Sequence, residues 1–437
     1  MTFDDFQLDP ALRRGIADLG FTEPTPIQAA ALPPALDGRD VLACAMTGSG
    51  KTAAFVLPIL KRLGARRERA VRALVLTPTR ELAAQVHEHL EALGRHTPIT
   101  SVAVFGGVKQ APQERALRAG VDVVVATPGR LLDLMQYPWA RFDGLEVLVL
   151  DEADRMLDMG FLPDVRRILD RLPRRRQTLL FSATLPRQIV ALARDMLSDP
   201  ATIDVERPSA PATGVAQTVL PVPAELKPKL LLELLERGDI HTALVFTRTK
   251  HRANRLAKFL GDRGMACDRI HGNRSQPQRQ AALSAFKDGR IRVLVATDIA
   301  ARGIDVEALP HVVNFDVPGQ PEDYIHRVGR TARARSTGTA LTFVSPAEAG
   351  ELAAIERAVG RQIDRHRIDG FDYGANPDGR FEVPIGERIA AIRARKADER
   401  ARSRAKAARQ PSPPQRRDGE AGPSQRRRRR RRPSSRS

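Results

Sequence analysis

The stretch Ala45-Met46-Thr47-Gly48-Ser49-Gly50-Lys51-Thr52 lies between an apolar run at 40–44 and a second apolar run at 53–57. This context predicts a strand, a loop and a helix, which is typical of a phosphate-binding loop. We expect Lys51 to approach the β- and γ-phosphates of a nucleotide and the Thr52 hydroxyl to hold Mg²⁺. A Gly-rich turn without a ligand is the alternative, but the placement of Gly50-Lys51-Thr52 favours a nucleotide site.

The alternation of apolar and amphipathic segments around this loop predicts an α/β protein. Short, continuous apolar runs are typical of strands buried on both faces of a parallel sheet. Residues 1–206 and 216–370 each show this pattern, so we expect two tandem parallel-sheet domains, joined by a Pro-, Ser- and Gly-rich linker at 207–215. The strands are predicted at 41–45, 73–77, 102–105, 121–126, 147–150, 178–182, 243–247, 266–270, 293–296, 312–315 and 340–344.

Charge is concentrated at the C-terminus of the chain. Of the net charge of +19 over 437 residues, residues 385–437 carry +14, from 19 Lys and Arg against five Asp and Glu. Seven consecutive arginines occupy 426–432. Such a segment buries too little apolar surface to offset its ordering entropy, so we expect a disordered basic tail over 371–437.

The remaining composition indicates an intracellular protein. No apolar run approaches the roughly 20 residues that span a bilayer, and the N-terminus is acidic, unlike a secretory signal. We therefore expect a cytoplasmic protein with no membrane partner. Cys44 and Cys267 lack metal-ligand spacing and are expected to be reduced core residues.

A carboxylate cluster follows the predicted strand at 147–150, namely Asp151-Glu152-Ala153-Asp154. Beside a phosphate loop, Asp151 suits the Mg²⁺ shell and Glu152 suits the orientation or deprotonation of an attacking water. An acidic turn without such a role is the alternative for an isolated cluster, but the pairing with Lys51 makes it unlikely.

Together with 45–52, this cluster resembles the DEAD-box ATP-dependent RNA helicase family of superfamily 2, and the other motifs of that family occur in order over residues 3 to about 360. The resemblance implies two RecA-like domains, ATP and Mg²⁺ as cofactors, and RNA as partner. The segment 21–28 resembles the Q motif, which implies that Gln28 reads the adenine edge and that Phe3 stacks on the base; without the family they would be a core Phe and a helix-start Gln. The implied nucleotide contacts are Phe3, Phe21, Thr25, Gln28, Thr47, Gly48, Ser49, Gly50, Lys51, Thr52, Gly303 and Asp305.

Further motifs of the family imply an RNA-binding surface at strand ends, where N–H groups, hydroxyls and arginines can hold phosphates and 2′-hydroxyls. The hydroxyls of 182–184 are implied to couple nucleotide state to domain arrangement, although helix capping is an alternative that can hold as well. The RNA residues are Pro78, Thr79, Arg80, Gly106, Gly107, Thr127, Pro128, Gly129, Arg130, Thr247, Arg248, Arg279, Thr297 and Arg302, and the coupling residues are Asp154, Ser182, Thr184 and His326.

The segment 324–333 completes the motif set. Arg327 and Arg330 are spaced like neighbours on one helix face, and the resemblance implies that both stabilise the γ-phosphate in the transition state. Ala332 stands where many members have Gly, which, with the short N-terminus, resembles the bacterial RhlE-type subgroup.

The expected function is an ATP-dependent RNA helicase that holds RNA by its backbone, with little sequence specificity, and locally unwinds short duplexes. Its catalytic residues would be Lys51, Asp151, Glu152, Arg327 and Arg330. The alternatives are an ATP-gated RNA clamp, annealing or RNP-remodelling protein, and a DNA helicase. Ribosome-assembly or RNA-decay proteins are possible partners, and the tail is expected to anchor RNA, with a solubilising extension or a nuclear import signal as alternatives.

Overall fold

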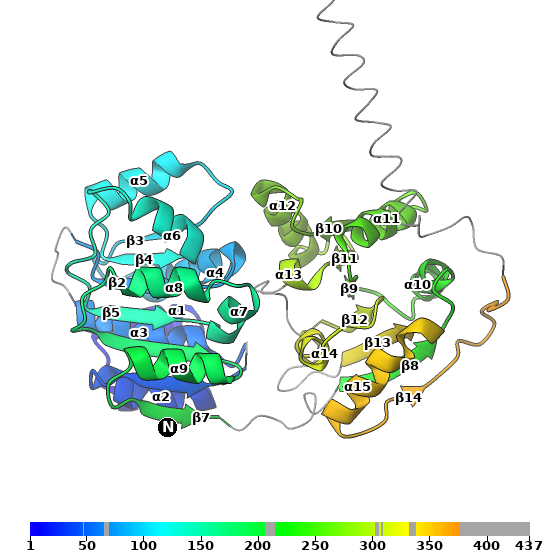
Figure 1. Cartoon of the computed structure of the whole chain (residues 1–437), viewed down its shortest axis with the longest axis horizontal. Coiled ribbons are helices and arrows are strands. Elements are labelled where there is room, and N and C mark those ends of the chain that lie inside the picture. Colours follow the sequence, from blue (N-terminus) through cyan, green and yellow to red (C-terminus); the bar gives the residue numbers. More distant parts are fainter. Residues whose placement is uncertain are drawn as a thin grey trace, which may run out of the picture. The chain divides into compact units, whose positions relative to one another are not determined.

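A computed structural model describes residues 1–46, 48–64, 70–205, 215–301, 306, 309–331 and 338–375. These residues form two lobes, each built on one parallel seven-stranded sheet flanked by helices (Figure 1). We call residues 1–205 the N-lobe and 215–375 the C-lobe. The predicted linker lies outside the described residues, apart from Val215, which begins a strand; the predicted tail lies outside them from residue 376 onward.

The N-lobe sheet has the order β3-β4-β2-β5-β6-β1-β7, and every neighbouring pair is parallel. Its strands are β1 (Val41–Cys44), β2 (Ala73–Leu76), β3 (Ser101–Val104), β4 (Val123–Ala126), β5 (Val147–Leu150), β6 (Gln177–Ser182) and β7 (Ala201–Asp204). Its helices are the short η1 (Phe3–Phe6), then α1 (Pro10–Asp18), α2 (Pro26–Leu36), α3 (Lys51–Leu63), α4 (Arg80–Leu93), α5 (Gln110–Ala119), α6 (Pro128–Leu134), α7 (Ala153–Asp158), α8 (Leu162–Leu169) and α9 (Arg187–Met196).

The continuous apolar runs are explained by burial on both faces of the sheet. Successive side chains of a strand point to opposite faces. Val147 and Val149 of β5 belong to one hydrophobic cluster, which includes α3 and α4, whereas Leu148 and Leu150 belong to a second, which includes α6, α8 and α9. Each strand position is therefore covered by a helix layer and selected to be apolar.

The C-lobe repeats this topology with the order β10-β11-β9-β12-β13-β8-β14, again entirely parallel. Its strands are β8 (Val215–Pro221), β9 (Ala243–Phe246), β10 (Cys267–Ile270), β11 (Val293–Ala296), β12 (His311–Asn314), β13 (Gly338–Val344) and β14 (Asp364–Arg365). Its helices are α10 (Lys227–Glu236), α11 (Lys250–Gly261), α12 (Gln276–Lys287), α13 (Asp298–Ala301), α14 (Pro321–Val328), the short η2 (Pro346–Glu348) and α15 (Ala349–Val359).

The predicted fold class is confirmed, and all the predicted strands are present to within about two residues at either end. Strands β7, β8 and β14 were not expected from the sequence. Cys44 is buried and Cys267 is half-buried, and both are free thiols. Among the described helices, none combines the length and the apolar character needed to cross a membrane.

Candidate functional site

Apart from the Q-motif residues, which precede β1, the candidate residues of the N-lobe follow the C-terminal ends of six strands. Because these strands are parallel and in register, their C-terminal ends meet at one edge of the sheet. The loops after β1, β5 and β6 carry the nucleotide and coupling candidates, and these strands are adjacent. The loops after β2, β3 and β4 carry the RNA candidates, and these strands are adjacent as well. The sheet order alone thus separates two functional surfaces along one edge.

The phosphate-loop candidate joins β1 to α3. Gly48 and Gly50 have φ of 79° and 93°, a left-handed conformation that favours glycine. Lys51 begins α3 and is buried, with its Nζ donating to the Ala45 carbonyl at 3.0 Å and lying 3.9 Å from Asp151 Oδ1. Thr47 lies outside the described residues. The loop therefore brings a buried ammonium and a helix N-terminus to the acidic turn.

Gln28 joins the Q-motif segment to this loop. Its Oε1 accepts a hydrogen bond from the Thr25 N–H at 3.0 Å, and its Nε2 donates to the Gly50 carbonyl at 3.0 Å. A Cβ at Gly50 would lie 2.7 Å from the same Nε2, so only glycine fits there. Phe3 is 6% exposed and stacks on Phe21 with ring centroids 6.5 Å apart. Gln28 is thus bonded as a helix-start residue and Phe3 packs in the core; their contacts with adenine stay predictions.

The acidic turn follows β5. Burial raises the pKa of Asp151 to about 6, an effect that Lys51 opposes. The Glu152 N–H donates to Asp151 Oδ1 at 2.9 Å, and Glu152 has φ of 52°, which is uncommon for a residue with a side chain. Mg²⁺ prefers oxygen ligands, which the ionised Asp151 carboxylate after β5 and the Thr52 hydroxyl in the first turn of α3 can supply. Asp151 and Thr52 are therefore suited to hold Mg²⁺.

The coupling candidates of the N-lobe are brought together. Asp154 Oδ2 accepts hydrogen bonds from the backbone N–H and the hydroxyl of Thr184, at 2.8 and 2.9 Å. Ser182 Oγ accepts from the Asp154 N–H at 3.1 Å and donates to the Thr184 carbonyl at 2.6 Å. These bonds tie the loop after β6 to the first turn of α7, so the two segments form one unit.

The RNA candidates of the N-lobe follow β2, β3 and β4 and include Arg80. Its guanidinium lies against Gly106 and Gly107, and a Cβ at Gly107 would be 2.0 Å from Arg80 Nη1. Thr79 Oγ1 caps α4 by accepting from the Leu82 N–H at 3.2 Å. Arg130 Nη1 donates to Gln113 Oε1 at 3.3 Å, which links α6 to α5. Thr127, Pro128 and Gly129 begin α6, and Pro78 precedes α4.

The RNA candidates of the C-lobe are less uniform. Thr247 is fully buried, and its hydroxyl lies 3.4 Å from both the Thr249 and the Ala296 carbonyl oxygens and can donate to either of them, so its expected RNA contact stays a prediction. Arg248 is half-exposed. Arg279 Nη2 donates to the Ala300 carbonyl at 3.3 Å, and the Thr297 carbonyl accepts from the Ala300 and Ala301 N–H groups at 2.9 and 2.8 Å. Arg302, Gly303 and Asp305 lie outside the described residues.

Arg327 has partners within the C-lobe that its sequence position does not predict. It lies in the last turn of α14, which ends at Val328, and the Arg330 N–H donates to the Arg327 carbonyl at 3.1 Å. Arg327 forms a bidentate pair with Asp298 at 2.6 and 2.7 Å, and its Nη1 donates to Asn314 Oδ1 and to the Asp316 carbonyl. Four of its five N–H groups are thereby used inside the C-lobe. Arg327 is fitted to hold this lobe together, and the expected phosphate contacts of Arg327 and Arg330 stay predictions.

Burial lowers the pKa of His326, the coupling candidate of α14, to about 4. The imidazole is therefore neutral at physiological pH. Sequence reasoning missed Asp298, Asn314 and Asp316, because their hydrogen-bond partners are distant in the chain.

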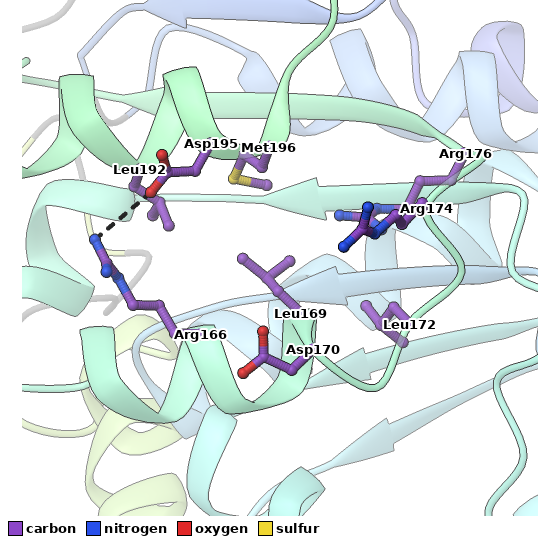
Figure 2. A pocket seen from close by; sticks show the side chains of 9 residues that line it. All are labelled: Arg166, Leu169, Asp170, Leu172, Arg174, Arg176, Leu192, Asp195 and Met196. Carbon is purple, nitrogen blue, oxygen red and sulfur yellow. Dashed lines mark ion pairs between the residues drawn. The ribbon is translucent and has the colours of Figure 1, made fainter.

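A separate cavity of about 690 Å³ lies between α8, α9 and the loop that precedes β6 (Figure 2). It is lined by three arginines, two aspartates, three leucines and a methionine, and its Arg166 lies 3.8 Å from Asp195. It contains none of the candidate residues. Since it adjoins the N-terminal end of β6, it lies at the opposite edge of the sheet from the acidic turn and the phosphate loop.

The fold and the site define a class of protein, a phosphate-loop ATPase with two RecA-like lobes. Residues 25–192 match the DEAD/DEAH box helicase family, and residues 226–335 match the helicase conserved C-terminal domain. The chain is 43% identical to the DEAD-box ATP-dependent RNA helicase CshA of Bacillus subtilis over 88% of this chain and 77% of that protein, and 43% identical to CshA of Geobacillus kaustophilus over 87% and 82%. The chain belongs to the DEAD-box ATP-dependent RNA helicase family.

Solved structures agree with this assignment. S. cerevisiae Dbp5 bound to RNA and ADP BeF3 matches with a TM-score of 0.76 at 34% identity, covering 84% of this chain and 95% of that chain. Mss116 bound to ssRNA and AMP-PNP matches with a TM-score of 0.76 at 27% identity, covering 85% and 80%. The RhlE-type subgroup is not confirmed, since CshA represents a different subgroup and Ala332 lies outside the described residues.

Proposed function

We propose that this chain couples the binding and hydrolysis of ATP to the local unwinding of short RNA duplexes, which it holds by the backbone. One observation carries the proposal: a single edge of the N-lobe sheet presents the phosphate loop, acidic turn and coupling loop on three adjacent strands, and the RNA candidates on the next three. A change on the nucleotide side can therefore reach the RNA side through directly paired strands.

The nucleotide side would bind ATP through the phosphate loop. Lys51 supplies a buried positive charge for the β- and γ-phosphates, and Asp151 and Thr52 would hold Mg²⁺, which neutralises phosphate charge when bound. Glu152 would orient the attacking water and accept its proton. Arg330 belongs to the C-lobe, so stabilisation of the transition state by this arginine would make hydrolysis depend on both lobes.

The RNA side would grip phosphates and 2′-hydroxyls. Arg80 is positioned on Gly106 and Gly107, and helix N-termini at α4 and α6 offer N–H groups to phosphate. Contacts of this kind do not read bases, which predicts little sequence specificity and a preference for RNA over DNA. The RNA present in the Dbp5 and Mss116 structures supports this proposal.

The division at 1–206, 216–370 and 371–437 is the corresponding proposal for the domains, with the basic tail as a nonspecific RNA anchor. An ATP-gated clamp or annealing protein uses the same residues and is the second candidate. A duplex assay separates them: strand separation with ATP, measured against AMP-PNP, is expected for a helicase. Equal strand release with both nucleotides, or faster annealing with ATP, would favour the second candidate.

A further inference from the structure

The C-lobe carries a counterpart of the nucleotide site at the equivalent place in its sheet. In the two strand orders, β8, β12 and β13 occupy the positions of β1, β5 and β6. Lys227 begins α10 after β8, just as Lys51 begins α3 after β1. Asp316 follows β12, as Asp151 follows β5. A lysine and a carboxylate therefore recur after matching strands of the two lobes. The segment that joins β8 to α10, however, is not a phosphate loop.

The Lys227 ammonium at this counterpart is bonded to groups of the C-lobe itself. Lys227 is fully buried, and its Nζ donates to the carbonyls of Phe315 and Phe343, both at 2.9 Å, and to Glu348 Oε2 at 2.6 Å. An ammonium has three N–H donors, so all of them are used. Burial lowers the pKa of Lys227, an effect that Glu348 opposes. This lysine stabilises the lobe itself and has no donor left for a phosphate.

The pair of Lys227 and Glu348 holds the backbone on both sides of Asp316. Lys227 binds the Phe315 carbonyl, and Glu348 Oε1 accepts from the Val317 N–H at 3.2 Å. Two peptide groups that flank Asp316 are therefore fixed by one buried ion pair. The Asp316 carbonyl, in turn, accepts from Arg327 Nη1 at 2.7 Å.

The Asp316 carboxylate acts on the loop after β9. Its Oδ2 accepts from the Arg248 N–H at 2.8 Å, and its Oδ1 lies 3.1 Å from Arg252 Nη2. Asp316 itself has no exposed surface, whereas the Arg248 side chain is 47% exposed. The carboxylate can therefore influence a bound polyanion only through the residues that it holds.

We propose that Asp316, fixed by Lys227 and Glu348, is a positioning residue that sets the Arg248 loop for contact with the RNA backbone. The inference rests on the proposed RNA contact of Arg248. An asparagine at 316 has one acceptor oxygen and an NH2 group in place of the two carboxylate oxygens, so it cannot accept from both the Arg248 N–H and the Arg252 guanidinium, and the loop is held less firmly. The expected loss is therefore in RNA affinity, while Lys51 and Asp151 belong to the N-lobe and keep their own contacts.

The test compares Asp316→Asn, Arg248→Ala and the double variant with the exposed control Asp262→Asn. The measured quantities are the single-stranded RNA concentration that half-saturates ATPase activity, kcat at saturating RNA, KM for ATP and the melting temperature. Asp316→Asn and Arg248→Ala are each expected to raise the half-saturating RNA concentration about tenfold, with kcat at saturating RNA within about twofold. The double variant is expected to resemble the single ones, because both changes remove one contact. Asp262→Asn is expected to match the wild type.

Should Asp316→Asn not fold, Lys227→Met combined with Glu348→Met replaces the buried pair with apolar side chains, a change that buried pairs often tolerate. This double variant frees the peptide groups around Asp316. We expect it to raise the half-saturating RNA concentration as much as Asp316→Asn does. An unchanged half-saturation in a folded Asp316 or Lys227/Glu348 variant, or full additivity with Arg248→Ala, overturns the inference. An unchanged half-saturation in Arg248→Ala instead overturns the proposed RNA contact, and the inference with it.

Discussion

Thr184 donates both its backbone N–H and its hydroxyl to one carboxylate oxygen of Asp154, at 2.8 and 2.9 Å. Asp154 is only 6% exposed, so these bonds act with little competition from water. They fasten the loop after β6 to the acidic turn after β5. Any displacement of the acidic turn on hydrolysis would therefore be transmitted to the loop that contains Ser182 and Thr184.

Thr184→Val keeps the side-chain shape and the backbone bond but removes the hydroxyl bond to Asp154. Since hydrogen bonds to charged groups contribute about 1.5–3 kcal/mol, we expect a loss of about 1–2 kcal/mol in the free energy of unfolding. ATP hydrolysis at saturating RNA should stay within about threefold, while duplex unwinding should fall at least about tenfold. Thr97→Val is the control, because it removes a hydroxyl bond to the Gly94 carbonyl away from the site. Parallel losses of hydrolysis and unwinding would contradict the coupling role.

Gly107→Ala tests whether the close contact with Gly107 positions the Arg80 guanidinium for RNA. The new Cβ would lie 2.0 Å from Arg80 Nη1 and must displace the guanidinium. We expect the half-saturating RNA concentration in the ATPase assay to rise several-fold. Gly107 also has φ of 83°, so any alanine there is strained; Gly160→Ala, with φ of 75° and no heavy atom within 4 Å of its Cβ, is the matched control for that strain. The same RNA shift in both variants would show that Arg80 is not the cause.

From the burial of His326 we predict that the folded protein loses stability in mild acid. Burial holds its folded-state pKa at about 4, below the ordinary value of 6.5. Protonation of His326 therefore favours the unfolded chain. The stability that depends on neutral His326 is fully present above pH 6.5 and is lost as the pH falls toward 4. At pH 5 this effect lowers the free energy of unfolding by about 2 kcal/mol.

The measurement is urea denaturation at pH 7.5 and pH 5. We expect His326→Gln to lose less stability between these values than the wild type, by about 2 kcal/mol. His366→Gln, at an exposed position, is the control and should follow the wild type. If His326→Gln and the wild type lose stability equally, protonation of His326 does not contribute.

Removal of residues 385–437 tests the basic tail. This segment carries 19 of the 71 Lys and Arg residues. Each neutralised single-strand phosphate contributes roughly 0.7 to the slope of log K against log salt, so the truncated chain should bind RNA more weakly and with a flatter salt dependence. Maximal ATPase activity at saturating RNA should be retained. An unchanged slope would mean that the tail does not contact RNA.

The sequence allowed the sheets to be predicted because parallel strands buried on both faces leave the clearest pattern. Strand β5, Val-Leu-Val-Leu, is fully buried and was located without error. Strand β7 alternates between half-buried and exposed positions, and β14 has only two residues, so neither yields a continuous apolar run. Strand β8 contains the polar Gln217 and ends at Pro221, so its sequence does not form a continuous apolar run either.

The candidate site was predictable where function lies in a local motif and not where it depends on distant partners. The phosphate loop and the acidic turn are contiguous segments. Lys227 and Glu348, in contrast, are 121 residues apart, and Lys227 alone resembles an ordinary helix-start lysine. Likewise, the spacing of Arg327 and Arg330 suggested a shared direction, but Asp298, 29 residues from Arg327, determines where that side chain lies.

In the proposed function, RNA stimulates ATP hydrolysis at the N-lobe site. The most direct measurement is steady-state ATPase activity with single-stranded RNA, with DNA of the same sequence and with no nucleic acid, for the wild type and for Glu152→Gln. We predict strong stimulation by RNA alone and a loss of at least about 100-fold in Glu152→Gln, because the buried carboxylate that orients water is removed. Equal stimulation by DNA, or activity that survives Glu152→Gln, would contradict the account.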